Sequence, residues 1–285
     1  MATPDSCGKY EEEIMGYWEE LNSDSPSREY WDENGSPKVE LPLLERLLSR
    51  SVKDGDSVRS GGLAKALDMW IAEELRAAGF DGEAVWPRLH APRVLDPSVL
   101  RFICSLNAKT AEACCEELPR YASSNANIMG SAYRKQVDVG LSSWMTGPEI
   151  LISTKTMGSS FGKNLANRFE EAYGDAKNLK GRHPLATLGF FFLVNSDIAC
   201  EPKNYAKAVS MLDKLQMEDD AYDVVCLMLA DFDPSGCVSV SEANETVPHH
   251  LSVHHFFSEL VSLTLLRASL EAHDLARAKV SGIRQ

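Results

Sequence analysis

The stretch Gly147–Leu179, GPEILISTKTMGSSFGKNLANRFEEAYGDAKNL, combines an apolar strand that carries a lysine with a polar helix. Alternate residues of a strand share one face, so Leu151, Ser153 and Lys155 point the same way. The helix is expected over about residues 160–179, because apolar side chains recur there at helical spacing. That stripe must face a sheet, and it consists of Leu165, Phe169, Ala172, Ala176 and Leu179. The stretch therefore predicts a strand and a helix that packs back onto its sheet.

The rest of the chain extends this pattern. A helix is expected from Leu63 to Gly79, two shorter ones within 97–118, and further helices at 204–216 and from about 252. Strands are expected at 133–141, 149–157, 185–195, 223–232 and 237–241. The run 185–195 is almost continuously apolar, as in a strand buried on both faces. This order predicts an α/β fold with a mixed central sheet and helices on both faces.

The composition is that of an ordinary soluble protein of 285 residues with a net charge of −13. It contains neither a membrane-spanning apolar run nor a signal-peptide core, so no membrane partner is expected. The seven cysteines form no CxxC pair, which favours a reducing cytoplasm. We expect residues 1–60 to form an acidic, partly ordered extension with a short helix at 41–50 and a polar linker at 51–62. Residues 61–285 would form the main domain.

The acidic charge is concentrated at the N-terminus. Residues 1–36 hold ten Asp or Glu and two Lys or Arg, a net charge of −8. Residues 149–184 reverse this balance, with six basic and four acidic side chains. A nucleic-acid-binding surface needs basic residues, so the overall charge weakens but does not exclude this class of partner.

Asp138 is the first candidate acid. If the loop between the two strands spans residues 142–149, Leu141 pairs with Ile150 and Asp138 falls opposite Ser153. Facing residues lie about 5 Å apart, so Asp138 and Lys155 converge on one side of the hairpin.

A second acid is required for a metal site, yet Ser153 stands where a carboxylate is expected. Glu149 has the right parity but lies six residues from Lys155, about 20 Å along a strand. Glu170 and Glu171, which flank the apolar stripe of the next helix, are better candidates. We favour Glu170 and keep Glu171 as the alternative.

This donor set predicts a Mg²⁺-dependent phosphodiesterase. Two carboxylates, Asp138 and the helix glutamate, would hold a hard cation through oxygen ligands. The cation polarises the phosphate and activates water, while Lys155 orients that water or stabilises the developing charge. Four further cations are candidates for DNA phosphate contacts: Lys163, Arg168, Lys177 and Arg182.

Asp138, the S-x-K of Ser153 to Lys155 and the helix glutamate resemble the PD-(D/E)xK restriction-endonuclease-like superfamily. They are most similar to its type II enzymes in which a helix glutamate replaces the strand glutamate. The resemblance implies a restriction-endonuclease-like core, double-stranded DNA as substrate, a homodimer and a cognate DNA methyltransferase. The helix at 63–80 is also similar to the first core helix of that fold. This similarity implies that Glu73 or Glu74 assists in binding the metal. Val137 departs from the family pattern, which has proline there.

Two other functions remain open. One is an inactive nuclease-fold module that binds DNA or a protein. The other is calcium binding by residues 231–242, where Asp231, Asp233, Ser235, Gly236 and Glu242 match an EF-hand loop. An EF-hand needs a helix on each side, whereas the flanking segments have strand patterns. The sequence Asp-Pro-Ser-Gly also suits a turn, so a hairpin is favoured.

Overall fold

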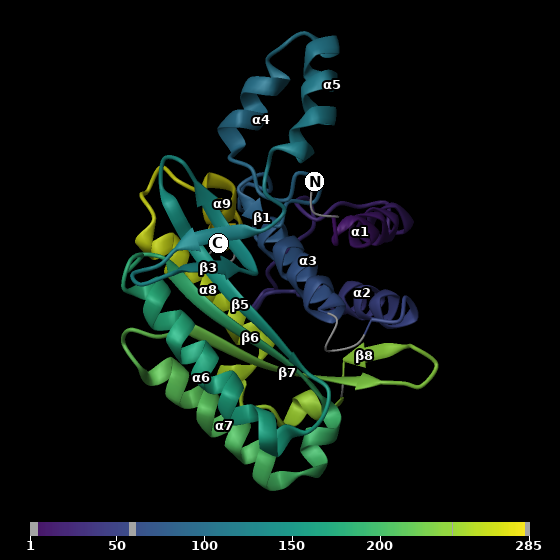
Figure 1. The fold of residues 1–285 in the computed structure, drawn as a ribbon, viewed down its shortest axis with the longest axis vertical. Helices are drawn as coiled ribbons and strands as arrows, with labels where there is room; N and C mark the ends of the chain where they lie inside the picture. Colours follow the sequence, from purple (N-terminus) through teal and green to yellow (C-terminus); the bar gives the residue numbers. More distant parts are fainter. Residues whose placement is uncertain (1–4, 57–60, 241, 283–285) are drawn as a thin grey trace.

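The computed structural model describes residues 5–56, 61–240 and 242–282. Its centre is a six-stranded mixed sheet in the order β1-β4-β5-β6-β7-β8 (Figure 1). The strands are β1 (Val85–Trp86), β4 (Val139–Ser143), β5 (Gly147–Met157), β6 (Thr187–Asn195), β7 (Val224–Phe232) and β8 (Val238–Val240). The predicted α/β fold with a mixed sheet flanked by helices is confirmed.

The strand directions follow from the connections. β4 and β5 form an antiparallel hairpin, and β5, β6 and β7 run parallel. Parallel neighbours need a crossover connection, which α6 (Phe161–Lys180) and α7 (Pro202–Met217) supply. β6 is buried over most of its length, as the apolar run predicts. The predicted pairing of Leu141 with Ile150 is also confirmed.

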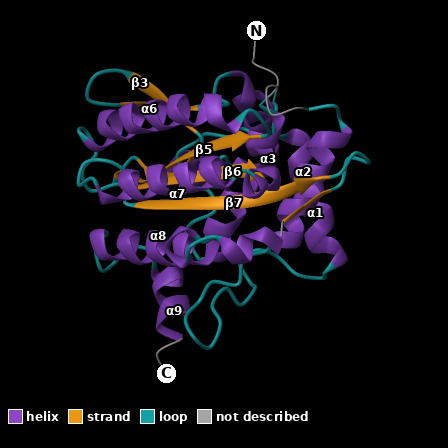
Figure 2. Cartoon of the chain, turned by 90° about the horizontal axis from the view of Figure 1, so that it is seen from below, coloured by secondary structure: helices purple, strands orange, loops and turns teal. Residues whose placement is uncertain are grey.

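Helices cover both faces of this sheet (Figure 2). α6 and α7 lie on one face, against β5, β6 and β7. The other face is covered by α3 (Gly62–Ala77) and α8 (Val253–Arg267). The stripe predicted for α6 faces the sheet, since Leu165, Ala172, Ala176 and Leu179 are buried there.

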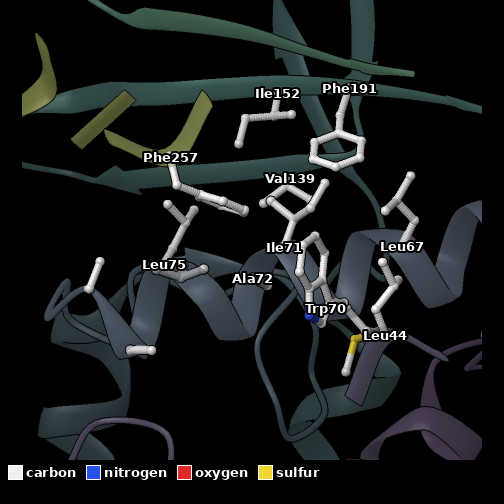
Figure 3. Close-up of a cluster of buried hydrophobic side chains, with 14 of the residues drawn as sticks. Leu44, Leu67, Trp70, Ile71, Ala72, Leu75, Val139, Ile152, Phe191 and Phe257 are labelled. Atoms are coloured by element: carbon white, nitrogen blue, oxygen red, sulfur yellow. The ribbon is translucent and has the colours of Figure 1, made fainter. Parts of the chain in front are cut away.

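The core on the α3 face contains the N-terminal segment. Trp70 of α3 packs edge-to-face against Phe191 and Phe257, with ring centroids 6.0 and 5.6 Å away (Figure 3). Leu44 lies in the same cluster, on α2 (Leu41–Lys53), which packs against α3. α1 (Gly8–Glu20) joins the cluster through buried Tyr10, Ile14 and Trp18. Residues 7–53 thus contribute many buried side chains to the main core, unlike the partly ordered extension that the sequence predicts. Residues 57–60 of the expected linker lie outside the described residues.

Smaller elements surround these layers. α4 (Pro97–Cys104) and α5 (Ala108–Glu117) project from the body as a helical hairpin (Figure 1). α9 (Asp274–Gly282) follows α8, and a separate two-stranded sheet pairs β2 (Ala126–Met129) with β3 (Arg134–Val137). The short 3-10 helices are η1 (Leu118–Arg120), η2 (Ser196–Cys200), η3 (Glu242–Thr246) and η4 (His249–Leu251). The strand expected at 133–141 is therefore two strands in different sheets, with Asp138 at the bend between them.

The segment 231–237 forms a hairpin turn, as favoured from its sequence. β7 pairs antiparallel with β8, and the Gly236 amide donates to the Asp233 carbonyl over 2.9 Å. Gly236 has φ = 88°, a left-handed conformation that suits glycine. Strands rather than helices flank the turn, so the geometry of an EF-hand is not formed. Ser241 and the side chain of Glu242 lie outside the described residues.

The shared core predicts that residues near the N-terminus stabilise the whole domain. Leu44→Ala should reduce the free energy of unfolding by about 2–5 kcal/mol, because Leu44 is fully buried. Met145→Ala is the control, since Met145 is 95% exposed and should cost within about 0.5 kcal/mol. Chemical denaturation measures both variants. Equal stability of the two would show that α2 is not part of the core.

Candidate active site

The candidate site lies where β5 extends beyond β4. β4 pairs with β5 only as far as Val139 and Ile152, whereas β6 accompanies β5 to Met157. Residues 153–157 of β5 consequently have a neighbour on one side only, among the strands that the structure describes. Backbone N–H groups on the open side need another acceptor.

Asp138 supplies that acceptor. The Thr154 amide donates a hydrogen bond of 3.0 Å to Asp138 Oδ2. A carboxylate thus replaces the carbonyl that a longer β4 would have provided. This contact agrees with the predicted position of Asp138 beside Ser153, whereas the convergence of Asp138 and Lys155 on one side of the hairpin stays a prediction.

A second carboxylate approaches from the α3 face. Thr154 Oγ1 donates to Asp68 Oδ1 over 2.6 Å, and Lys65 Nζ donates to Asp68 Oδ2 over 2.9 Å. Asp68 is fully buried. Thr154 therefore connects the two acids, binding Asp138 through its amide and Asp68 through its hydroxyl.

The two carboxylates affect each other electrostatically. The pKa of Asp138 is raised from 3.8 to about 6, first by burial and then by the negative charge of Asp68. The Thr154 amide, Lys65 and Lys155 oppose this rise. The folded protein therefore destabilises the ionised form of the Asp138 carboxyl group relative to the unfolded chain.

Lys155 lies on the opposite face of β5, toward α6. Its Nζ is 4.0 Å from Glu171 Oε2, and Glu171 also accepts from Arg168 Nη1 over 2.9 Å. Glu170 is exposed. The structure therefore brings Glu171, not the favoured Glu170, next to Lys155. Ser153 is buried on the same face as Lys155, as its parity predicts.

The two glutamates predicted to assist from α3 have other partners. Glu74 Oε2 accepts from Arg28 over 2.6 Å, and its Oε1 accepts from the Glu40 amide over 3.1 Å. Burial raises the pKa of Glu74 to about 7, although Arg28 and that amide lower it. Glu73 is paired with Arg76. These glutamates hold the N-terminal segment and the C-terminal half of α3, and Asp68 is the acid of this helix that reaches the site.

The remaining candidates are spread over the surface of α6 and its end. Lys163 and Arg182 are exposed, and Arg168 is engaged by Glu171. Lys177 forms a salt bridge with Asp220 and lies 4.7 Å from the centre of the Tyr173 ring. Glu149, rejected as the second acid, binds His273 over 2.7 Å. Of the predicted phosphate contacts, Arg168 is thus linked to Lys155 through Glu171.

Asp68, Thr154 and Lys65 were missed by the sequence reasoning. One signal was present: Thr154 is a polar residue on the strand face that otherwise carries Ile150 and Ile152. A polar group on that face requires a polar partner on the helix covering it. Asp68 and Lys65, three residues apart on that helix, form such a partner pair.

The donor set suits a magnesium ion. Among the described side chains, no group of three or more His, Cys, Asp or Glu forms a metal-binding cluster. Mg²⁺ is usually held by one or two carboxylates together with substrate phosphates and water, so Asp138 and Asp68 match its needs. The raised pKa of Asp138 supports the fit, because a divalent cation would relieve the repulsion between the two acids.

Comparisons with protein-family models, curated proteins and solved structures returned no match to this chain. Within the described ranges, the helices include none that is long and apolar enough to cross a membrane. The site must therefore be judged on its own geometry.

Asp138→Asn should stabilise the metal-free protein at neutral and higher pH. The asparagine can still accept from the Thr154 amide, but it carries no buried charge. A pKa of about 6 in the folded state, against 3.8 unfolded, means that wild-type stability falls as pH rises through this window. The variant should therefore gain about 1–3 kcal/mol at pH 8 and much less near pH 4.

Thermal and chemical unfolding in EDTA across this pH range measure the gain. Asp223→Asn is a useful contrast, because Lys180 and Arg267 bind that carboxylate and its pKa is lowered. That variant should lose stability at neutral pH. A loss for Asp138→Asn that does not change with pH would contradict the electrostatic account.

Proposed function

We propose that this protein is a Mg²⁺-dependent DNA endonuclease, and that its substrate is double-stranded DNA as in sequence-specific type II restriction enzymes. The observation that carries the proposal is that Thr154 binds both Asp138 and Asp68 at the open edge of β5, while the charge of Lys155 acts on Asp138. Two carboxylates beside a lysine are the groups that metal-assisted phosphodiester hydrolysis requires. The resemblance of Asp138 and the S-x-K strand to PD-(D/E)xK enzymes points to the same reaction.

Each residue has a distinct task in this proposal. Asp138 and Asp68 bind the cation, and Thr154 fixes their positions through its amide and hydroxyl. A bound Mg²⁺ supplies polarisation of the scissile phosphate and activation of water. Lys155 orients the attacking water or stabilises negative charge on the phosphate, and Glu171 positions the Lys155 ammonium.

The proposed partners follow from the proposed reaction. Cutting both strands of a symmetric DNA site favours a two-fold symmetric homodimer. A restriction enzyme also requires a DNA methyltransferase that protects the host sequence. Both partners are part of the proposal.

An inactive nuclease-fold module that binds DNA or a protein is the second candidate. It is favoured by the contacts of Asp68, because both of its oxygens already accept hydrogen bonds, from Thr154 and Lys65. In an inactive module these contacts would serve only the stability of the fold. Metal binding distinguishes the two candidates.

Cleavage of DNA tests the proposed activity. Wild-type protein with Mg²⁺ should cut unmethylated genomic and phage DNA into discrete fragments, resolved on gels. Lys155→Ala should reduce the rate by about a hundredfold or more, because it removes a charge that stabilises the transition state. Lys214→Ala is the matched control, since Lys214 is exposed on α7 and should leave the rate unchanged. Equal cleavage by all three proteins would indicate a contaminant, and no cleavage of varied DNA would favour the inactive module.

The pH dependence of the cleavage rate should reflect the ionisation of Asp138. The carboxylate must be ionised to bind the cation, so cleavage should fall as pH drops through about 6 at low Mg²⁺. Higher Mg²⁺ competes with protons and should move the midpoint to lower pH. Initial rates at several Mg²⁺ concentrations measure this shift. A midpoint independent of Mg²⁺ would remove Asp138 from the metal site.

A further inference from the structure

Lys65 has the most unusual position among the charged groups of the site. It lies on α3, one helical turn before Asp68, and its Nζ is 2.9 Å from Asp68 Oδ2. Its pKa is raised, first by the charge of Asp68, with Asp138 contributing as well. One ammonium therefore neutralises part of the charge of both carboxylates.

The ammonium occupies one of the two carboxylate oxygens of Asp68. Thr154 Oγ1 donates to Oδ1 of Asp68, and Lys65 Nζ donates to Oδ2. Lys65 and Asp138 also line one small cavity of about 10 Å³, roughly the size of a single water molecule. A cation that binds Asp68 through Oδ2 would have to displace the ammonium from that oxygen.

We propose that Lys65 holds the cation position in the metal-free protein and competes with the divalent ion for Asp68. This inference rests on the proposed metal site. The side chain of Lys65 is 25% exposed, and in this proposal the ammonium moves toward solvent when the divalent ion binds. Lys65 thereby stabilises the folded site in the absence of metal. It also raises the metal concentration at which the site becomes occupied.

The competition predicts tighter metal binding when the charge is removed. Mn²⁺ is the probe, titrated by calorimetry into the full-length protein. Lys65→Met should bind Mn²⁺ about tenfold or more tightly than wild type, since it removes a positive charge within a few ångströms of the ion. Lys65→Arg keeps the charge and should stay within about twofold of wild type.

Stability gives an independent readout. Without metal, Lys65→Met should melt below wild type, because Asp68 loses its counter-charge. Saturating Mn²⁺ should raise its melting temperature by more than that of wild type, as tighter binding requires. If the methionine variant does not fold, Lys65→Gln replaces it, since the amide can still donate to Asp68 without a charge.

The outcomes separate this inference from the proposed function. Tighter Mn²⁺ binding by Lys65→Met or Lys65→Gln, but not Lys65→Arg, would support the competition. Wild-type binding that is lost in Asp138→Asn, with no gain in the uncharged Lys65 variants, would overturn the competition and leave the metal site standing. Absence of Mn²⁺ binding in every protein, Lys65→Met included, would overturn both.

Discussion

The arrangement of the site depends on the backbone amide of Thr154, for which β4 provides no acceptor. β4 ends its pairing with β5 at Val139, and the amide of Thr154 would otherwise have no acceptor. A buried N–H without a partner costs about as much as a lost hydrogen bond. The structure meets this need with the Asp138 carboxylate, which ties a charged group to a fixed point of the central strand. One contact thus satisfies a buried amide and fixes the position of a candidate metal ligand.

The open edge of β5 carries charged groups on both faces of the sheet. Asp68 approaches from the α3 face, while Lys155 and Glu171 belong to the α6 face. The rigid elements hold them in place: α3 is buried from Ala66 to Ala77, and β5 is hydrogen-bonded to β6 from Ile150 to Met157. Charged groups held on rigid elements can be preorganised for a reaction.

Much of this architecture was predictable from periodicity. The central strand 185–195, the helix after Lys155 and the pairing of Leu141 with Ile150 each follow from local patterns that tertiary packing reinforces. The acid on α3 was not predictable in the same way. Glu73 and Glu74 lie about 8 Å further along the helix than Asp68, at 1.5 Å per residue. Which of these acids contacts Thr154 depends on the position of α3 along its own axis relative to β5. No local sequence pattern determines that position. The β2–β3 sheet was missed because the chain continues through Asp138 with a strand-like pattern while changing sheets.

The central claim is that Asp138 and Asp68 form one metal site at the open edge of β5. Crystals of the wild-type protein soaked in Mn²⁺ test it most directly, through the anomalous scattering of the ion. The account predicts a peak within coordination distance of a carboxylate oxygen of each residue, at about 2.0–2.3 Å, and its loss in Asp138→Asn crystals. A well-ordered site with both carboxylates in place and no peak at saturating Mn²⁺ would contradict it.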